Sequence, residues 1–276
     1  MNKADYYYVK NLTEIMENGQ WDENPRPKWK DGKPAHSKFI GPIFEEYDIS
    51  QDEYPITTLR NTAIKMGIKE IFWIYQLQSN KLSDAHNLGI TWWDNFNIGD
   101  NTIGQRYGAT IKKYDLMNNI LRSLQDNPYS RRHIINMYQE SDLKSSKGLY
   151  PCAFETLWSV RKIKDNFFLD MTLIQRSNDY IIANQINKIQ YVALLQMVCS
   201  HLGYKPGKFF HIVQNLHIYD RHIDAAKELL NKEPMNIQPI VKLKNYKKFY
   251  DFNIDDFEIL NVDRISKISS PLEIAI

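Results

Sequence analysis

The sequence predicts an α+β fold in one domain that spans residues 1–276. Strand-like and helix-like stretches follow one another without a regular strand–helix–strand alternation, which argues against a doubly wound parallel sheet. The chain is 43% hydrophobic and 25% charged, so it can bury a core, and no proline- or serine-rich linker divides it. Aromatic residues make up 13% of the chain, which suits a large sheet core or a pocket for planar ligands.

In the N-terminal half, the pattern predicts loops and two helices. Residues 1–50 are expected to be loop-rich, because the stretch NPRPKWKDGKPAHSK is dense in basic residues, proline and glycine. Apolar residues near helical spacing predict a helix over 58–78. The following stretch, 82–108, is aromatic and rich in turn residues. A second helix is predicted over 113–125, where the sequence DNPYS ends it.

In the C-terminal half, strands and helices are interleaved. Strands are predicted over 133–138, 154–162 and 167–175, the last with partial alternation. The stretch NKIQYVALLQMVCSHLG is expected to be an apolar helix that ends at Gly203. The stretch GKFFHIVQNLHIY is expected to be one further strand, and DRHIDAAKELLNK an amphipathic helix.

Charge and cysteine content exclude several classes of protein. The net charge of +2 gives no strong field for a nucleic-acid polymer, although a small anion held by local arginines is compatible with it. The first residues, MNKADYYYVK, lack the apolar segment of a signal peptide, and no apolar run is long enough to span a bilayer. Two cysteines form no disulfide framework and no metal-binding spacing, so we expect a reducing cytoplasm and no metal.

The two cysteines stand in different settings. Cys199 lies inside the predicted apolar helix and is expected to be a small core residue. Cys152 directly follows Pro151 at the start of an apolar, alternating stretch. A lone cysteine is more often a core residue. The basic residues near Cys152 in sequence nevertheless fit a nucleophile, because positive surroundings lower the pKa of a thiol.

Three arginines are candidates for holding a phosphate. Arg131 and Arg132 stand in tandem after a proline turn and fit either a solvated surface pair or a fork for an anion. Arg176 follows a largely apolar strand, where an unpaired charge is costly, and is followed by Ser177 and Asp179.

Further polar residues are candidates for contacts with a sugar and for proton transfer. His217 and Tyr219 are two apart on a strand, so they share a face and could contact a sugar hydroxyl, unless the histidine is bonded within the core. Glu70 lies in the apolar stretch IKEIFWIY and is either exposed or buried. If it is buried, its raised pKa would allow proton transfer near neutral pH.

Five motifs together resemble the folate-dependent thymidylate synthases. YPCAF, SRRHI, QRSND, INKIQY and LHIYDRH occur in the family's order and rough spacing, and the resemblance runs from DGKPAHS to the terminal EIAI. It implies a large twisted mixed β-sheet, flanked by helices, that packs against the same sheet of a second subunit in a homodimer. It implies a methyltransferase that makes dTMP from dUMP with 5,10-methylenetetrahydrofolate, giving dihydrofolate, and that needs no metal, membrane or nucleic acid.

The resemblance also implies roles for individual residues. Cys152 matches the nucleophile that adds to uracil C6, Asn187 matches the reader of the uracil edge, and Glu70 and Tyr107 match the proton-transfer network. The residues expected to bind the nucleotide are Arg131 and Arg132 (both lent by the partner subunit), Gln175, Arg176, Ser177, Asp179, Asn187, His217 and Tyr219. The residues expected to bind the folate are Trp93, Leu149, Asp179 and Ile276, the last in a closing lid.

The chain also departs from the family pattern. Ala153 follows the nucleophile where the family commonly has histidine, and ANQIN replaces a run with glycine and proline, which suggests a divergent bacterial or bacteriophage branch. Arg26, Lys28 and Lys30 all compete as the N-terminal phosphate ligand. The alternatives are a dUMP hydroxymethylase of the same fold, against which the match of Trp93 and the AI terminus argue, and a non-catalytic nucleotide- or RNA-binding relative.

Overall fold

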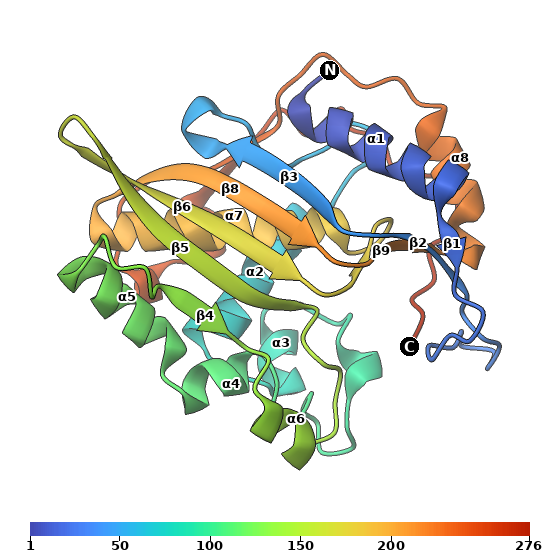
Figure 1. The fold of residues 1–276 in the computed structure, drawn as a ribbon, viewed down its shortest axis with the longest axis horizontal. Coiled ribbons are helices and arrows are strands. Elements are labelled where there is room, and N and C mark those ends of the chain that lie inside the picture. The colour runs from blue at the N-terminus through green and yellow to red at the C-terminus, as the bar shows by residue number, and fades with distance from the viewer.

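A five-stranded mixed sheet forms the centre of the computed structural model, which describes residues 1–276 (Figure 1). Its order is β3-β8-β6-β5-β4, and only the β6–β8 pair is parallel. The strands are β3 (Ile43–Asp48), β4 (Ile134–Asn136), β5 (Ala153–Ile163), β6 (Asn166–Gln175) and β8 (Lys205–Val213). The predicted α+β class, the mixed sheet and the three strands of the middle region are therefore confirmed, with β4 shorter than predicted.

The buried helix α7 (Asn184–Leu202) packs behind this sheet (Figure 1). Its side chains, apolar and polar alike, are buried around most of the circumference because α2 covers one side and strands β6 and β8 cover the other. The helix ends as predicted at Gly203, which adopts a φ of 72° that favours glycine.

Two smaller sheets flank the central one. The first has the order β1-β2-β9-β7 and the second pairs β10 with β11. Their strands are β1 (Gln20–Trp21), β2 (Ser37–Ile40), β7 (Asn178–Asp179), β9 (Leu216–Tyr219), β10 (Ile240–Leu243) and β11 (Phe257–Leu260).

The single strand predicted over 207–219 is wrong, because the chain changes sheets there. Strand β8 ends at Val213 in the central sheet, and β9 begins at Leu216 beside β2 and β7. The two residues between them are bonded to neighbouring strands: Gln214 N–H donates to the carbonyl of Gln175, and the carbonyl of Asn215 accepts from Asn178 N–H. This change of sheet carries the following residues away from the central sheet.

The prediction that residues 1–50 are loop-rich is also wrong. Helix α1 (Lys3–Asn18) is capped by Asn2, whose side chain accepts from Asp5 N–H, and it buries Tyr8, Leu12 and Ile15. These three positions have helical spacing, so a sequence signal was present and was outweighed by the proline- and glycine-rich stretch that follows.

The helix predicted over 58–78 begins later, as α2 (Ile64–Ile71), and continues as a π-helical turn over Phe72–Gln76. The buried carboxylate of Asp5 accepts from Thr57 Oγ1 and from both N–H and Oγ1 of Thr58, so these groups are bonded outside a helix.

The helix predicted over 113–125 is confirmed as α5 (Leu116–Asp126), which begins later than predicted, and the helix α4 (Gly108–Lys113) before it was not predicted. They are separated at Asp115, which has a φ of 49°. The remaining helices are α3 (Leu82–Asn87), α6 (Glu140–Ser145) and α8 (Ile223–Leu230). No helix in the protein has the length and apolar character needed to cross a membrane.

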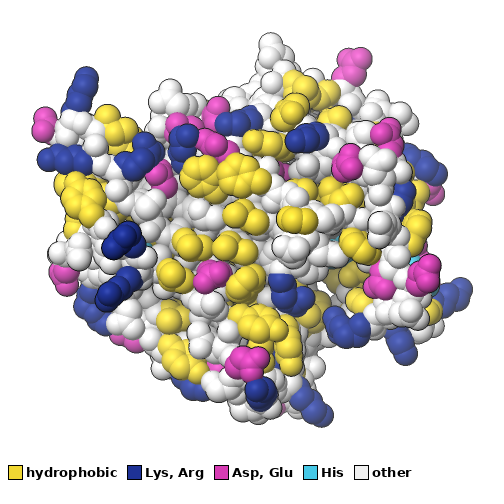
Figure 2. Space-filling model, in the orientation of Figure 1, with side chains coloured by type: hydrophobic (Ala, Val, Ile, Leu, Met, Phe, Trp, Pro, Cys, Tyr) yellow, Lys and Arg dark blue, Asp and Glu magenta, His cyan; other side chains and the backbone are white.

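The front face of the central sheet carries no helix (Figure 1). Figure 2 shows apolar side chains distributed across this face. Phe44 and Leu157 remain 54% and 36% exposed, and Phe44 stacks on Phe210 of the neighbouring strand at 5.7 Å between ring centroids. An exposed apolar sheet face of this kind is typical of an interaction surface.

Candidate active site

Cys152 lies just before strand β5, and the guanidinium group of Arg176 holds the segment that carries it. Arg176 Nε donates to the carbonyl of Pro151 (3.0 Å) and Nη2 donates to the carbonyl of Tyr150 (2.7 Å). The same Nη2 lies 3.5 Å from Cys152 Sγ. Arg176 follows β6, which pairs with β5, so the sheet register brings these distant residues together.

The pKa of the Cys152 thiol is raised, contrary to the expectation that its surroundings lower it. Burial raises the pKa, and the charges of Arg176 and Arg26 oppose this without overcoming it. Of the three competing N-terminal cations, Arg26 is therefore the one whose charge acts on the thiol. The backbone N–H and carbonyl of Lys28 are hydrogen-bonded to Ile276 at the C-terminus.

Tyr107 contacts Cys152 from the other side. Its hydroxyl accepts from Cys152 N–H at 3.1 Å, and burial raises its pKa. The tyrosine ring stands edge-on to Trp93, with centroids 5.2 Å apart. Tyr107 has a φ of 46°, and the next residue, Gly108, has no room for a Cβ beside Ser79, so the chain is tightly folded here.

Glu70 of α2 is buried, and its carboxylate accepts from the indole N–H of Trp92 at 2.6 Å. Burial raises its pKa to about 7, and the hydrogen bond from Trp92 opposes this rise. Of the two alternatives for Glu70, an exposed or a buried acid, the structure shows the buried one. Trp92 itself was missed by the sequence reasoning, because its neighbour Trp93 carried the family match.

This pKa predicts a pH-dependent effect of Glu70→Gln on stability. An acid whose folded pKa lies above its unfolded value of about 4.5 favours folding at low pH, and the benefit is lost as the pH rises through 7. Glutamine cannot ionise. The free energy of unfolding of Glu70→Gln, relative to that of wild type, should therefore rise on the order of 3 kcal/mol between about pH 5 and 8. Urea unfolding at both pH values measures this, with exposed Glu17→Gln as the control. Equal differences at both pH values would show that Glu70 titrates normally.

Asn187 lies in the first turns of α7 within a group of carboxamides. Its Oδ1 accepts from Gln175 Nε2 (3.2 Å) and from Asn178 Nδ2 (3.0 Å), and its Nδ2 donates to Gln190 Oε1 (2.9 Å). Gln175 and Asn178 are buried at the ends of β6 and β7, so strand ends and a helix start converge on one polar group. Asn178 and Gln190 were not identified from sequence.

His217 and Tyr219 do share a face of β9, with ring centroids 5.1 Å apart. His217 Nδ1 is bonded to Asn215 Oδ1 at 3.0 Å, and burial lowers its pKa, so the imidazole is neutral at pH 7. Asp179 lies beside them on β7, paired in register with His217, and its Oδ1 accepts from two backbone N–H groups of the following turn. Ser177 lies between Arg176 and this strand, partly exposed.

The other residues that were expected to bind the folate lie in three separate segments of the chain, outside helices and strands. Trp93 is buried and Leu149 packs partly buried against the core. Ile276 is 43% exposed, and its backbone pairs with Lys28. Glu273, nearby in the C-terminal tail, is paired with Arg221 at 2.8 Å, so the tail is fastened to the N-terminal loop and to the turn after β9.

Arg131 and Arg132 are not joined to Cys152 within one chain. Both are exposed on the loop between α5 and β4, and no hydrogen bond or ion pair links either guanidinium to another residue of the protein. His133, which follows them, pairs with Trp158 in the middle of β5, several residues from the end that carries Cys152.

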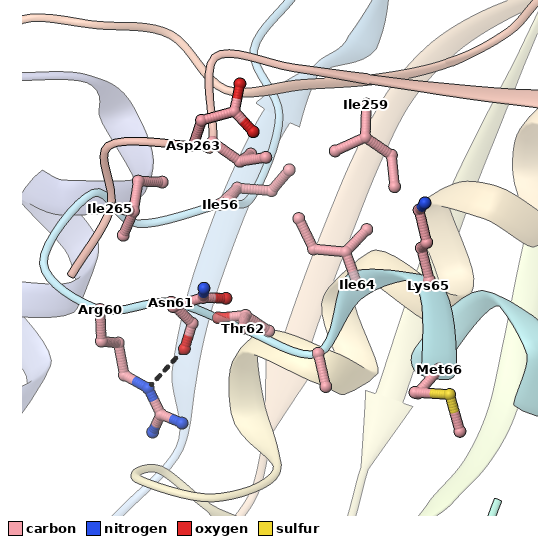
Figure 3. Close-up of a pocket in the computed structure, with 12 residues that line it drawn as sticks. Ile56, Arg60, Asn61, Thr62, Ile64, Lys65, Met66, Ile259, Asp263 and Ile265 are labelled. Carbon is pink, nitrogen blue, oxygen red and sulfur yellow. Dashed lines mark hydrogen bonds between the residues drawn. The ribbon is translucent and has the colours of Figure 1, made fainter. Parts of the chain in front are cut away.

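A cleft lies at the N-terminal end of α2, the helix that carries Glu70. Figure 3 shows Ile56, Ile64 and Ile259 around it, with the Arg60 guanidinium turned away from the isoleucines. Arg60 Nη1 donates to the carbonyl of Ile181. Lys65 and Asp263 stand at the same cleft, so its walls are apolar and its margin is charged.

Comparisons with known proteins agree with one another. A sequence model described as thymidylate synthase matches residues 6–274. The thymidylate synthases of Streptococcus mutans and Streptococcus gordonii are both 46% identical, over 269 and 271 residues, which is 96% of each chain. Among solved structures, the thermostable thymidylate synthase A from Bacillus subtilis superposes with a TM-score of 0.89 at 33% identity and covers 99% of both chains.

Proposed function

Since this chain belongs to the thymidylate synthase family, we propose that its activity depends on addition of Cys152 Sγ to C6 of dUMP. The protein is a methyltransferase that converts dUMP to dTMP, with 5,10-methylenetetrahydrofolate as the co-substrate and dihydrofolate as the second product. The observation that carries the site assignment is the position of Cys152 Sγ, 3.5 Å from the Arg176 guanidinium, on a residue whose backbone N–H donates to the hydroxyl of Tyr107.

The thiol must lose its proton for the carbon–sulfur bond to form. The charges of Arg176 and Arg26 favour the thiolate, and the same guanidinium groups suit the phosphate of dUMP. Attack at C6 places an electron pair at C5, which forms a bond to the one-carbon unit of the folate. The proton on C5 is then removed and the bond from the one-carbon unit to the folate nitrogen breaks. Hydride from the folate, which becomes dihydrofolate, converts the resulting methylene to methyl, and the Cys152–C6 bond breaks to release dTMP. In this proposal, Glu70 and Tyr107 move protons at the base, and a pKa of about 7 suits Glu70 to both directions of transfer.

The other residues serve to bind and orient. Asn187, with Gln175, contacts the uracil edge, while His217 and Tyr219 contact the ribose and Ser177 assists at the phosphate. For the folate, we propose Trp93, Leu149 and Asp179, with the tail at Ile276 closing over the site to exclude water. The apolar cleft at the start of α2 shares no lining residue with Trp93, Leu149, Asp179 or Ile276, so it is not part of this proposed folate site.

The products distinguish this activity from its alternatives. Incubation with dUMP and 5,10-methylenetetrahydrofolate should give dTMP with a rise in dihydrofolate absorbance. Hydroxymethylated dUMP without that rise would indicate the hydroxymethylase, and no product would indicate a binding protein. The expected setting is the cytoplasm, since Cys152 and Cys199 are both free thiols.

We further propose that the protein acts as a homodimer through the uncovered sheet face. This face carries Phe44, Leu157 and Phe210, and burying it would remove apolar surface from water (Figure 2). Arg131 and Arg132 lack a partner in their own chain, which fits guanidinium groups that reach a phosphate in the neighbouring subunit.

Mixing two defective variants tests the sharing of arginines. Arg131→Ala subunits and Cys152→Ala subunits should each be weak or inactive alone. After subunit exchange, a heterodimer should regain one site with both the cysteine and the arginine, so the turnover of the mixture should exceed that of either variant. Mixing Arg26→Ala with Cys152→Ala subunits is the control for a residue that acts in its own subunit's site, because each site of that heterodimer then carries one lesion and turnover should not recover. No recovery with Arg131→Ala after confirmed exchange would contradict shared sites.

A further inference from the structure

The carboxamides around Asn187 form a chain of hydrogen bonds with one direction. Gln175 and Asn178 donate to Asn187, and Asn187 donates to Gln190. A carboxamide that turns over exchanges its oxygen and nitrogen, so amides bonded only to one another could all reverse and keep their bonds. Gln190 Nε2 has no partner and could serve the reversed order. A group that cannot reverse must therefore set the direction.

His211 is the group at the end of this chain. It is fully buried on β8, and its Nε2 lies 2.6 Å from Gln175 Oε1. With Gln175 in this orientation, the bond requires a proton on Nε2, because an amide oxygen can only accept. A second branch of hydrogen bonds begins at Thr57 N–H, which donates to Gln185 at a distance of 3.4 Å. Gln185 donates to Asn184, and Asn184 donates to Asn178, so this branch also points toward Asn187. The short bond to His211 is the stronger anchor.

The surroundings of His211 keep the proton on Nε2. Its neighbour across the strands is Glu45, whose carboxylate already accepts from Asn11, Tyr47 and Lys188. Nδ1 of His211 has no partner, so a proton there would be a buried donor without an acceptor, which proteins tolerate less than an unpaired acceptor. Burial and the charge of Lys188 lower the pKa of His211 to about 3 against the opposing effect of Glu45, so the ring is neutral.

We propose that His211 is a positioning residue for base specificity. Its Nε2 proton fixes the orientation of Gln175, which fixes Asn187 so that the second hydrogen of its NH2 group, the one not bonded to Gln190, can be donated to O4 of uracil. In the reverse order, Asn187 would present its oxygen, which suits the amino group of cytosine. The buried Glu45–Lys188 pair contributes by leaving Nδ1 without an acceptor. This inference rests on the proposed contact between Asn187 and the base.

The test compares the affinities for dUMP and dCMP by calorimetry. Phenylalanine cannot donate, so in His211→Phe the amide chain can reverse and the preference for dUMP over dCMP should fall by about tenfold or more. Phe209→Leu removes a buried ring that stacks on His211 but leaves Nε2 in place, so it should lower stability and keep the preference within about twofold. If His211→Phe does not fold, His211→Gln replaces it, because an amide there can donate or accept and sets no direction.

Three results would decide the proposal. The tautomer is read directly from the ¹⁵N shifts of His211 in wild type, and a proton on Nδ1 would overturn it. An unchanged preference for dUMP over dCMP in folded His211→Phe, or in His211→Gln, would also overturn the role of His211. Turnover of dUMP by wild type would leave the proposed function intact in that case. Equal loss of preference in Phe209→Leu would show a packing effect and overturn it as well. Failure of wild type to act on dUMP would instead contradict the proposed function.

Discussion

We expect the Cys152→Ala protein to lose nearly all turnover of dUMP while it still binds the nucleotide. The methyl side chain cannot add to C6, so C5 stays a poor nucleophile and the covalent route is closed. Binding should persist because the contacts proposed for Arg176 with the phosphate and for Asn187 with the base do not require the sulfur. Loss of a covalent step should lower turnover at least about a hundredfold, measured as dihydrofolate formation.

The second cysteine supplies the matched control for this experiment. Cys199 is buried in α7, away from any proposed contact with substrate, so Cys199→Ala should cost some stability and leave turnover per folded molecule near that of wild type. Calorimetry with dUMP shows whether Cys152→Ala is folded and competent to bind. Retention of more than about a hundredth of wild-type turnover would show that Cys152 is not the nucleophile.

We expect Asn187→Asp to move the nucleotide preference toward dCMP. Uracil presents O4 as an acceptor and N3–H as a donor, whereas cytosine presents an N4 amino donor and N3 as an acceptor. A carboxylate accepts from the amino group, and when protonated it also donates to N3. An unpaired buried polar group costs roughly 1–3 kcal/mol, which corresponds to about a ten- to hundredfold change in preference.

The measurement is the ratio of kcat/KM for dUMP and dCMP in both proteins. Wild type should prefer dUMP strongly, and Asn187→Asp should reduce or reverse that preference. The exposed residue Asn231, after helix α8, gives a matched control, since Asn231→Asp adds the same charge far from the carboxamide chain. An unchanged ratio in Asn187→Asp would show that Asn187 does not read the base.

Local sequence patterns predicted much of the central architecture. The apolar stretch of α7 and its end at Gly203, and the alternation over β5 and β6, report burial with the periods of a helix and a strand, so they were predictable one element at a time. Local patterns failed where a distant residue intervened. Helix α2 starts late because Asp5 bonds the threonines before it.

The chemistry of the site divides in the same way. The sequence by itself singled out Cys152 after Pro151, because a reactive side chain in an unusual setting is visible locally, and the order of five motifs indicated the family. It could not choose among the three N-terminal cations. The fold brings the charge of Arg26 to bear on the thiol, while the backbone of Lys28 pairs with the C-terminus.

Only the tertiary structure decided how these residues are tuned. The net rise in the pKa of Cys152 and the value of about 7 for Glu70 both come from burial, which depends on every element packed around a group. The bond between His211 and Gln175 depends on the register of two parallel strands that are separated along the chain by all of α7. Sequence patterns record which face of an element is buried, but strand register and sheet order determine which buried side chains meet.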